Sequence, residues 1–125
     1  METLTKAEEK VMKILWSLKK GLIRDIVNEY PDPKPAYTTV ATIIKILDKK
    51  GFVSRSSVAN TFQYAPTVGE DEYSKTYMKS FIKRYFSDSF KNMVSAFGTE
   101  EELTTKDMEE LISHFQEQID KKKKA

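Results

Sequence analysis

The chain has 125 residues and a net charge of +2, with 39% apolar, 11% aromatic and 32% charged residues. That composition is typical of a folded domain, and the length leaves no room for two large independent cores. The absence of cysteine excludes disulfides, thiolate metal sites and a cysteine nucleophile. Because no apolar run approaches the roughly 18 residues that span a bilayer, and no signal segment follows Met1, we expect a cytoplasmic protein without direct membrane binding.

The first predicted helix begins at a capping box. Thr5 is a favourable N-cap, and Glu8 stands three residues later, where its carboxylate can return a hydrogen bond. The helix is expected to run to about Leu18, and Gly21 is expected to end it in the left-handed conformation that glycine favours. Trp16 lies near the apolar stripe, which favours a place in the core over a ligand contact. The stripe itself consists of Val11, Ile14, Leu15 and Leu18.

Two further helices are predicted on either side of a stiff connector. The first spans about residues 22–30 and stops at a run of prolines, which cannot continue a helix: Pro31, Pro33 and Pro35. The second begins near Ala36 or Tyr37, runs to about Lys50 and is closed by Gly51. Its core face is expected to carry Val40, Ile43, Ile44 and Leu47.

After the third helix the apolar pattern changes from helical spacing to alternation. Residues 52–55 and 62–65 form two expected strands, with a polar break from Ser56 to Thr61 between them. Three helices followed by a hairpin are the winged-helix arrangement, in which the third helix enters the major groove of DNA and the hairpin is the wing. We therefore predict a winged-helix DNA-binding domain at residues 1–66.

The second half of the chain, residues 67–125, predicts a helical dimerisation domain. One long amphipathic helix is expected from Glu70 to about Phe97, without internal proline or glycine, and a last helix from about Thr104 to Lys121. Two such helices cannot close a core alone, so their apolar faces favour a homodimer; the alternative is that both fold back on the first domain. The residues expected at the dimer interface are Tyr73, Tyr77, Phe81, Tyr85, Phe86, Phe90, Met93, Val94, Leu111 and Phe115.

The predicted fold is mainly α with a small β-hairpin: a winged helix-turn-helix domain plus a two-helix C-terminal dimerisation arm. Residues 1–66 hold eleven Lys and Arg against seven acids, a balance of +4, whereas residues 67–125 hold ten against twelve, a balance of −2. The first half is therefore the expected binder of a polyanion such as double-stranded DNA.

The start of the third predicted helix carries candidate DNA contacts. A threonine hydroxyl can hydrogen-bond a base edge or a phosphate, although threonines at a helix start are also common caps. Lysine and arginine side chains around this helix can neutralise phosphates, or can simply be solvated charges. In the hairpin, Arg55 and Asn60 can reach the minor groove or the backbone, although a polar tip needs no function. The predicted DNA-binding residues are Lys6, Tyr37, Thr38, Thr39, Thr42, Lys45, Lys49, Lys50, Arg55 and Asn60, with Lys34 as a further cation beside them.

The sequence lacks the residue sets that catalysis or metal binding would need. His114 is the only histidine, so neither a multi-histidine metal site nor a histidine triad with a second base can be built. The four glycines form no phosphate-binding loop. We predict no enzyme activity and no cofactor. The alternative function is a winged-helix protein-interaction module without sequence-specific DNA binding.

Four stretches are specific enough to compare with known families. They are Leu4-Thr5-Lys6-Ala7-Glu8 with Val11-Met12 and Leu15-Trp16; Thr39-Val40 and Thr42 with Lys49-Lys50-Gly51-Phe52-Val53; Phe62-Gln63-Tyr64; and, in the tail, Phe81-Ile82, Phe90, Leu103 and Glu109-Glu110-Leu111. With these stretches the sequence resembles the BlaI/MecI family of penicillinase repressors from Leu4 to Lys121.

The resemblance implies a dimer that binds a palindromic operator and represses transcription, often of β-lactam resistance genes. It also implies a membrane-bound sensor protease as a partner, whose signal leads to cutting of the repressor within its arm. By position, the equivalent bond here joins Ala96 and Phe97. The family commonly has basic residues where this chain has Thr38, Ala41 and Ile46, so the resemblance implies an operator sequence or an affinity that differs from the usual one. The family usually has asparagine before the cut bond, where this chain has Ala96, so the chain departs from the family at the proteolytic switch. The paired cysteines of copper-responsive relatives are absent here, which argues against metal sensing.

Overall fold

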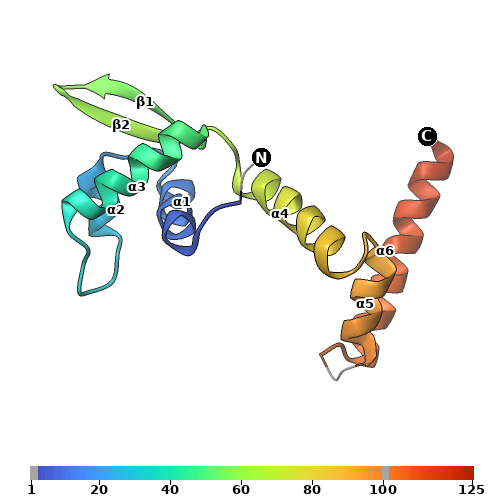
Figure 1. The fold of residues 1–125 in the computed structure, drawn as a ribbon. Coiled ribbons are helices and arrows are strands. Elements are labelled where there is room, and N and C mark those ends of the chain that lie inside the picture. The colour runs from blue at the N-terminus through green and yellow to red at the C-terminus, as the bar shows by residue number, and fades with distance from the viewer. Residues whose placement is uncertain (1–2, 100–101) are drawn as a thin grey trace. The chain divides into compact units, whose positions relative to one another are not determined.

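The computed structural model describes residues 3–99 and 102–125 and is mainly helical with one β-hairpin, as the sequence predicted (Figure 1). Two compact units divide the chain: an N-terminal unit, Met1–Tyr77, and a C-terminal unit, Met78–Ala125. The elements are α1 (Lys6–Leu18), α2 (Ile23–Asn28), α3 (Tyr37–Lys50), β1 (Val53–Val58), β2 (Thr61–Pro66), α4 (Glu70–Tyr85), α5 (Phe90–Thr99) and α6 (Thr105–Lys124).

Helix α1 begins at the predicted capping box but ends differently from the prediction. The Glu8 backbone N–H donates to Thr5 Oγ1 at 3.2 Å, and the Thr5 N–H donates to Glu8 Oε1 at 3.0 Å. The left-handed residue at the other end is Lys19, with φ of 72°, so the role predicted for Gly21 is wrong. Gly21 instead forms a β-bridge with Tyr64, through N–H···O bonds of 2.9 and 2.8 Å. The helix must stop before residue 21 because that backbone pairs with β2.

Helices α1, α2 and α3 enclose the core of the N-terminal unit. Helix α3 begins at Tyr37 and is closed by Gly51 with φ of 84°, and both ends confirm the prediction. The side chains of α3 that face the core follow the helical repeat, which leaves the opposite face of this helix to solvent. The fully buried core residues are Val11, Met12 and Leu15 of α1, Ile26 of α2, and Val40, Ile44 and Leu47 of α3.

The hairpin is confirmed, with a tighter turn than the sequence predicted. Its strands pair antiparallel from Val53 opposite Pro66 to Val58 opposite Thr61, so the expected polar break from Ser56 to Thr61 is mostly strand. Only Ala59 and Asn60 form the turn, with φ of 46° and 66°. Two consecutive residues of positive φ make a turn whose twist matches that of the strands, and the pairing can therefore continue to the tip.

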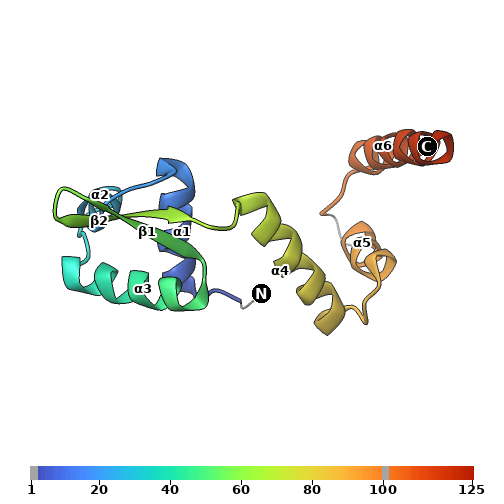
Figure 2. The ribbon, with the colours of Figure 1, turned by 90° about the horizontal axis from the view of Figure 1, so that it is seen from above.

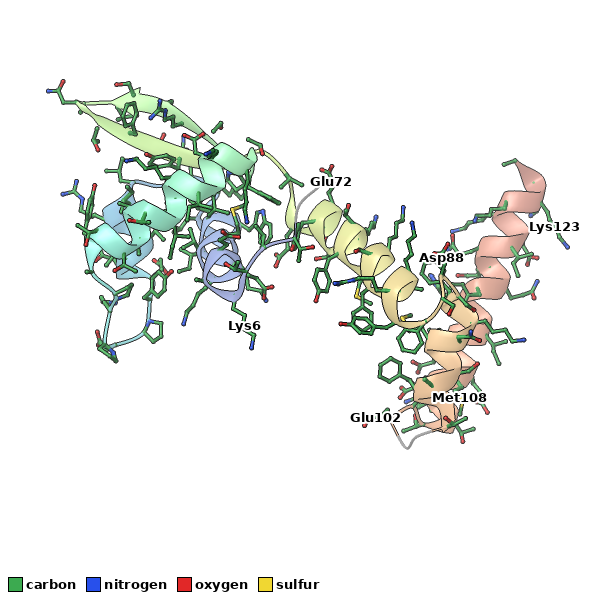
Figure 3. The ribbon with its side chains drawn as sticks, viewed as in Figure 1. Lys6, Glu72, Asp88, Glu102, Met108 and Lys123 are labelled. Atoms are coloured by element: carbon green, nitrogen blue, oxygen red, sulfur yellow. The ribbon has the colours of Figure 1, made fainter. Side chains whose placement is uncertain are left out.

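The single helix predicted from Glu70 to Phe97 is wrong, because the structure has two helices there. The chain turns after Tyr85, where Ser87 and Asp88 adopt φ of 51° and 60°, and Figure 3 shows Asp88 in this turn. The Asp88 N–H donates to the Ile82 carbonyl at 3.1 Å, which satisfies the end of α4. Ser89 Oγ then accepts the Asn92 N–H at 3.1 Å and caps α5, so the break needs neither proline nor glycine.

The two units divide within α4, later in the chain than the predicted boundary after residue 66. The reason is that the chain after the hairpin remains packed on the first core. Trp16 Nε1 donates to the Val68 carbonyl at 2.9 Å, and the Leu4 N–H donates to the Tyr73 hydroxyl at 2.9 Å. The Tyr73 ring lies 5.7 Å from that of Phe52 and 6.0 Å from that of Trp16. The first turns of α4 therefore belong to the N-terminal unit.

The C-terminal unit contains the rest of α4 with α5 and α6. The predicted last helix is confirmed, since the Asp107 N–H donates to Thr104 Oγ1 at 3.0 Å and α6 runs to Lys124. In α4 the ring of Phe81 lies 4.9 Å from that of Tyr85. None of the described residues of α5 or α6 is fully buried within one chain.

Candidate nucleic-acid interface

One face of α3 is exposed along its whole length and is mostly polar. Thr38, Thr42, Lys45 and Lys49 are three or four positions apart and all exposed, so they share one stripe. Thr42 Oγ1 donates to the Thr38 carbonyl at 2.9 Å, which fixes the hydroxyl and leaves its lone pairs facing outward. The exposed side chains on this helix are Tyr37, Thr38, Thr39, Thr42, Lys45, Ile46 and Lys49.

The cations around α3 fall into two groups that the sequence could not separate. Lys34 donates from Nζ to the carbonyls of Asn28 and Tyr30, at 2.9 and 2.6 Å, and thereby caps the end of α2. Lys45 and Lys49, by contrast, make no ion pair with any residue that the structure describes. Their charges are therefore available to an external anion, whereas Lys34 already uses two of its three donors on backbone carbonyls.

Lys50 belongs to the engaged group. Its Nζ lies 2.8 Å from Glu8 Oε1, and the two side chains are 22% and 6% exposed. Burial opposes the ionisation of Glu8, but the hydrogen bonds from Lys50 and from the Thr5 N–H together outweigh it and hold the pKa of Glu8 below its ordinary value. The ionised pair joins the end of α3 to the start of α1, which is a structural role, and the phosphate contact predicted for Lys50 stays a prediction.

The wing presents a cation and an apolar tip. Arg55 extends over the Phe62 ring, with its guanidinium carbon 4.7 Å from the ring centroid, and its Nε lies 3.9 Å from Asp48 Oδ2. Arg55 remains more than half exposed, so these contacts orient the guanidinium without covering it. Val58 and Phe62 are also exposed, and Asn60 stands in the turn. Lys6 differs from the other predicted contacts, because Figure 3 shows it leaving α1 on the side away from the hairpin.

Arg24 of α2 is a candidate that sequence reasoning missed. It lines a groove of about 500 Å³ between α2, the start of α3 and the hairpin tip. Figure 2 shows that the tip and the start of α3 lie at the same end of this unit. Arg24 is exposed while Ile26 is buried, so the helical repeat of α2 was the available signal. The groove is lined by Leu22, Ile23, Arg24, Tyr37, Ala59 and Thr61.

The residues predicted at a dimer interface occupy different environments within the chain. Tyr73 is only 7% exposed because it lies in the first core. Phe81, Phe86 and Met93 are half-buried. The others remain exposed: Tyr77, Tyr85, Phe90, Val94, Leu111 and Phe115. Ile112, at 69%, and Phe97, at 49%, add to this exposed apolar surface, and Ala96 beside Phe97 is also exposed on α5.

The residues that the structure describes form neither a membrane-spanning helix nor a metal site. None of the helices that the structure describes is both long and apolar enough to cross a membrane. Within residues 3–99 and 102–125, no three His, Asp or Glu side chains lie close enough together to hold a metal ion.

Three helices, a hairpin and an exposed polar face on α3 define a winged helix-turn-helix protein with a helical C-terminal extension. Comparison with known proteins identifies its family: the penicillinase repressor model matches residues 4–117. The chain therefore belongs to the penicillinase repressor family, as the sequence motifs indicated.

Relatives in this family cover nearly the whole chain. The methicillin resistance regulatory protein MecI of Staphylococcus aureus (strain N315) is 32% identical over 109 residues, which are 86% of this chain and 89% of MecI. A penicillinase repressor of Staphylococcus aureus is 31% identical and covers 86% of each chain. A penicillinase repressor of Bacillus licheniformis is 25% identical over 121 residues, covering 96% of this chain and 94% of the relative.

Proposed function

We propose that this protein is a homodimeric transcriptional repressor that binds a palindromic operator through α3 and the hairpin. The observation that carries the proposal is the exposed stripe on α3, where small hydroxyls and lysines without an ion pair among the described residues lie on one face. A narrow polar face lets a helix enter the major groove deeply, and threonine can contact base edges there. The family of the chain supports the repressor function.

The dimer is supported by the apolar surface that the C-terminal unit leaves uncovered. Side chains such as Tyr85, Phe90 and Phe115 are each more than half exposed in one chain. Apolar patches of this kind usually mark an interface, and a second copy of the same surface covers it with two-fold symmetry. Two linked reading modules then bind two half-sites about one helical turn apart.

Selection from random duplexes tests this function. We expect the purified protein to recover a two-fold symmetric site, and Thr39→Val with Thr42→Val to relax its base preference and to weaken binding by about 1 kcal/mol per lost contact. Thr76→Val is the matched control, because Thr76 Oγ1 donates to the Glu72 carbonyl in α4 just as Thr42 does to Thr38 in α3. Binding that lacks sequence preference and vanishes with salt would favour the protein-interaction module instead.

We further propose that repression ends when a sensor protease partner leads to cutting of the bond between Ala96 and Phe97. Both residues are exposed on α5, a helix of only ten residues that lacks buried side chains, so local opening to an extended substrate is easy. The expected result is two fragments, separated between residues 96 and 97, when intact-mass spectrometry is applied to protein from cells exposed to a β-lactam. A chain that stays intact while the operator is released would contradict this mode of release.

A further inference from the structure

The groove beside the start of α3 lies where one strand of a bound duplex would pass. Its walls come from three elements: Leu22 to Arg24 of α2, Tyr37 at the first turn of α3, and Ala59 with Thr61 at the hairpin tip. When a helix occupies the major groove, the two sugar–phosphate strands run along its sides. A hollow between that helix and the wing is therefore placed to receive backbone rather than bases.

The groove contains one cation, Arg24, that pairs with no carboxylate among residues 3–99 and 102–125. Arg24 has no ion-pair partner in the described part of the chain, whereas Lys34, Lys50 and Arg55 each have internal contacts. Asp25 of α2 and Glu29, which follows that helix, do not line the groove, and the Asp25 carboxylate accepts the Leu22 N–H at 2.9 Å. A guanidinium without an ion pair favours an anion with paired oxygens, because its planar donors match phosphate geometry.

The remaining residues of the groove suit an uncharged group next to this anion, such as a sugar. The Tyr37 side chain is 54% exposed and offers both a hydroxyl and an aromatic face, and Thr61 adds a second hydroxyl. The side chains of Leu22, Ile23 and Ala59 supply apolar surface for a deoxyribose. The combination of one guanidinium, two hydroxyls and an apolar floor is complementary to a phosphodiester with its sugar.

We propose that this groove binds a backbone phosphate of duplex DNA and that Arg24 contacts the phosphate directly. The inference rests on the proposed function and deepens it, because Arg24 extends the DNA-binding surface from α3 to α2. This contact fixes the position of the module on the duplex and carries no base preference.

The salt dependence of binding to a random-sequence duplex tests the contact without knowledge of the operator. Each phosphate neutralised contributes about 0.9 to the slope of log K against log salt. Arg24→Ala should lower the slope by about 0.9 per protomer and hence by about 1.8 for the dimer, a loss of roughly 60-fold in affinity at 0.1 M salt that disappears at 1 M. Arg24→Lys should keep the slope. Lys13→Ala is the matched control, because Lys13 is an exposed cation in a different hollow that includes no residue of α3 or the hairpin.

A duplex with single neutral methylphosphonate linkages then identifies the phosphate. On the site selected by the wild-type protein, one substituted position should weaken wild-type binding and leave Arg24→Ala binding unchanged, since the two changes remove the same contact. If the wild-type protein binds duplexes but Arg24→Ala keeps the full salt slope, the groove proposal is overturned and the repressor function stands. If the wild-type protein binds no duplex, both are overturned.

Discussion

Replacing Ile112 and Phe115 with aspartate will convert the protein to a monomer and weaken binding to a palindromic site by about 10²- to 10⁴-fold. Ile112 and Phe115 are 69% and 57% exposed in one chain, so the substitutions remove little of its internal packing. A charged residue in an apolar interface must be desolvated without a partner, which opposes association. In the dimer, binding of one winged-helix module raises the effective concentration of the other at the second half-site, and a monomer loses this gain.

Sedimentation equilibrium measures the loss of the dimer, and a titration with the selected DNA site measures the loss of affinity. The control is Ser113→Asp with Gln116→Asp, which adds the same charge to the polar side of α6, where both residues are exposed. We expect this control to remain dimeric. A monomeric wild-type protein would favour the alternative in which α4 to α6 fold back on the first domain.

Tyr73→Ala is expected to lower the free energy of unfolding by about 3–5 kcal/mol, the range for a buried aromatic side chain. The ring fills the space between Phe52 and Trp16, and its hydroxyl accepts the Leu4 N–H. Tyr73→Phe keeps the ring and loses one hydrogen bond, so about 1 kcal/mol should be lost. Urea unfolding can be followed by the fluorescence of Trp16, the only tryptophan in the sequence.

Tyr37→Ala is the control for this series, because Tyr37 is 54% exposed and lies outside the proposed dimer surface, so its removal should change the free energy of unfolding little. The series also tests the interface role that the sequence pattern predicted for Tyr73. If Tyr73→Ala dissociates the dimer and leaves the free energy of unfolding unchanged, Tyr73 is an interface residue and its assignment to the core is wrong.

Local signals predicted most of the N-terminal unit, because its elements begin and end at residues whose own chemistry favours those positions. Thr5 with Glu8 caps α1, the prolines stop α2, and Gly51 closes α3. The break after α4 had a weaker signal, because no proline or glycine marks it. Ser89 is a favourable N-cap for α5, but Ser87 and Asp88 adopt positive φ, which helical periodicity does not show. The helical spacing of apolar residues likewise put Tyr73 on one stripe with Phe81. Spacing alone does not indicate which part of the protein packs against each of these two side chains.

The candidate interface was only partly predictable for a similar reason. Helical spacing was enough to put Thr38, Thr42 and Lys45 on the outer face of α3. Whether a lysine is available to DNA depends on partners that lie close in space and far apart in the chain. Glu8 pairs with Lys50 across 42 positions, and the groove that contains Arg24 is completed by the hairpin tip.

The bridge between Gly21 and Tyr64 divides the wing into a base and a tip that tolerate sequence changes to different degrees. At the base, the paired backbones hold β2 to the segment after α1, and Tyr64 is buried, so a change in strand length there would disrupt the core. From Ser56 to Phe62 the side chains are exposed and make no such pairing with the helices. Substitutions at the tip are therefore expected to leave the frame that presents α3 unchanged, whereas substitutions at the base are not.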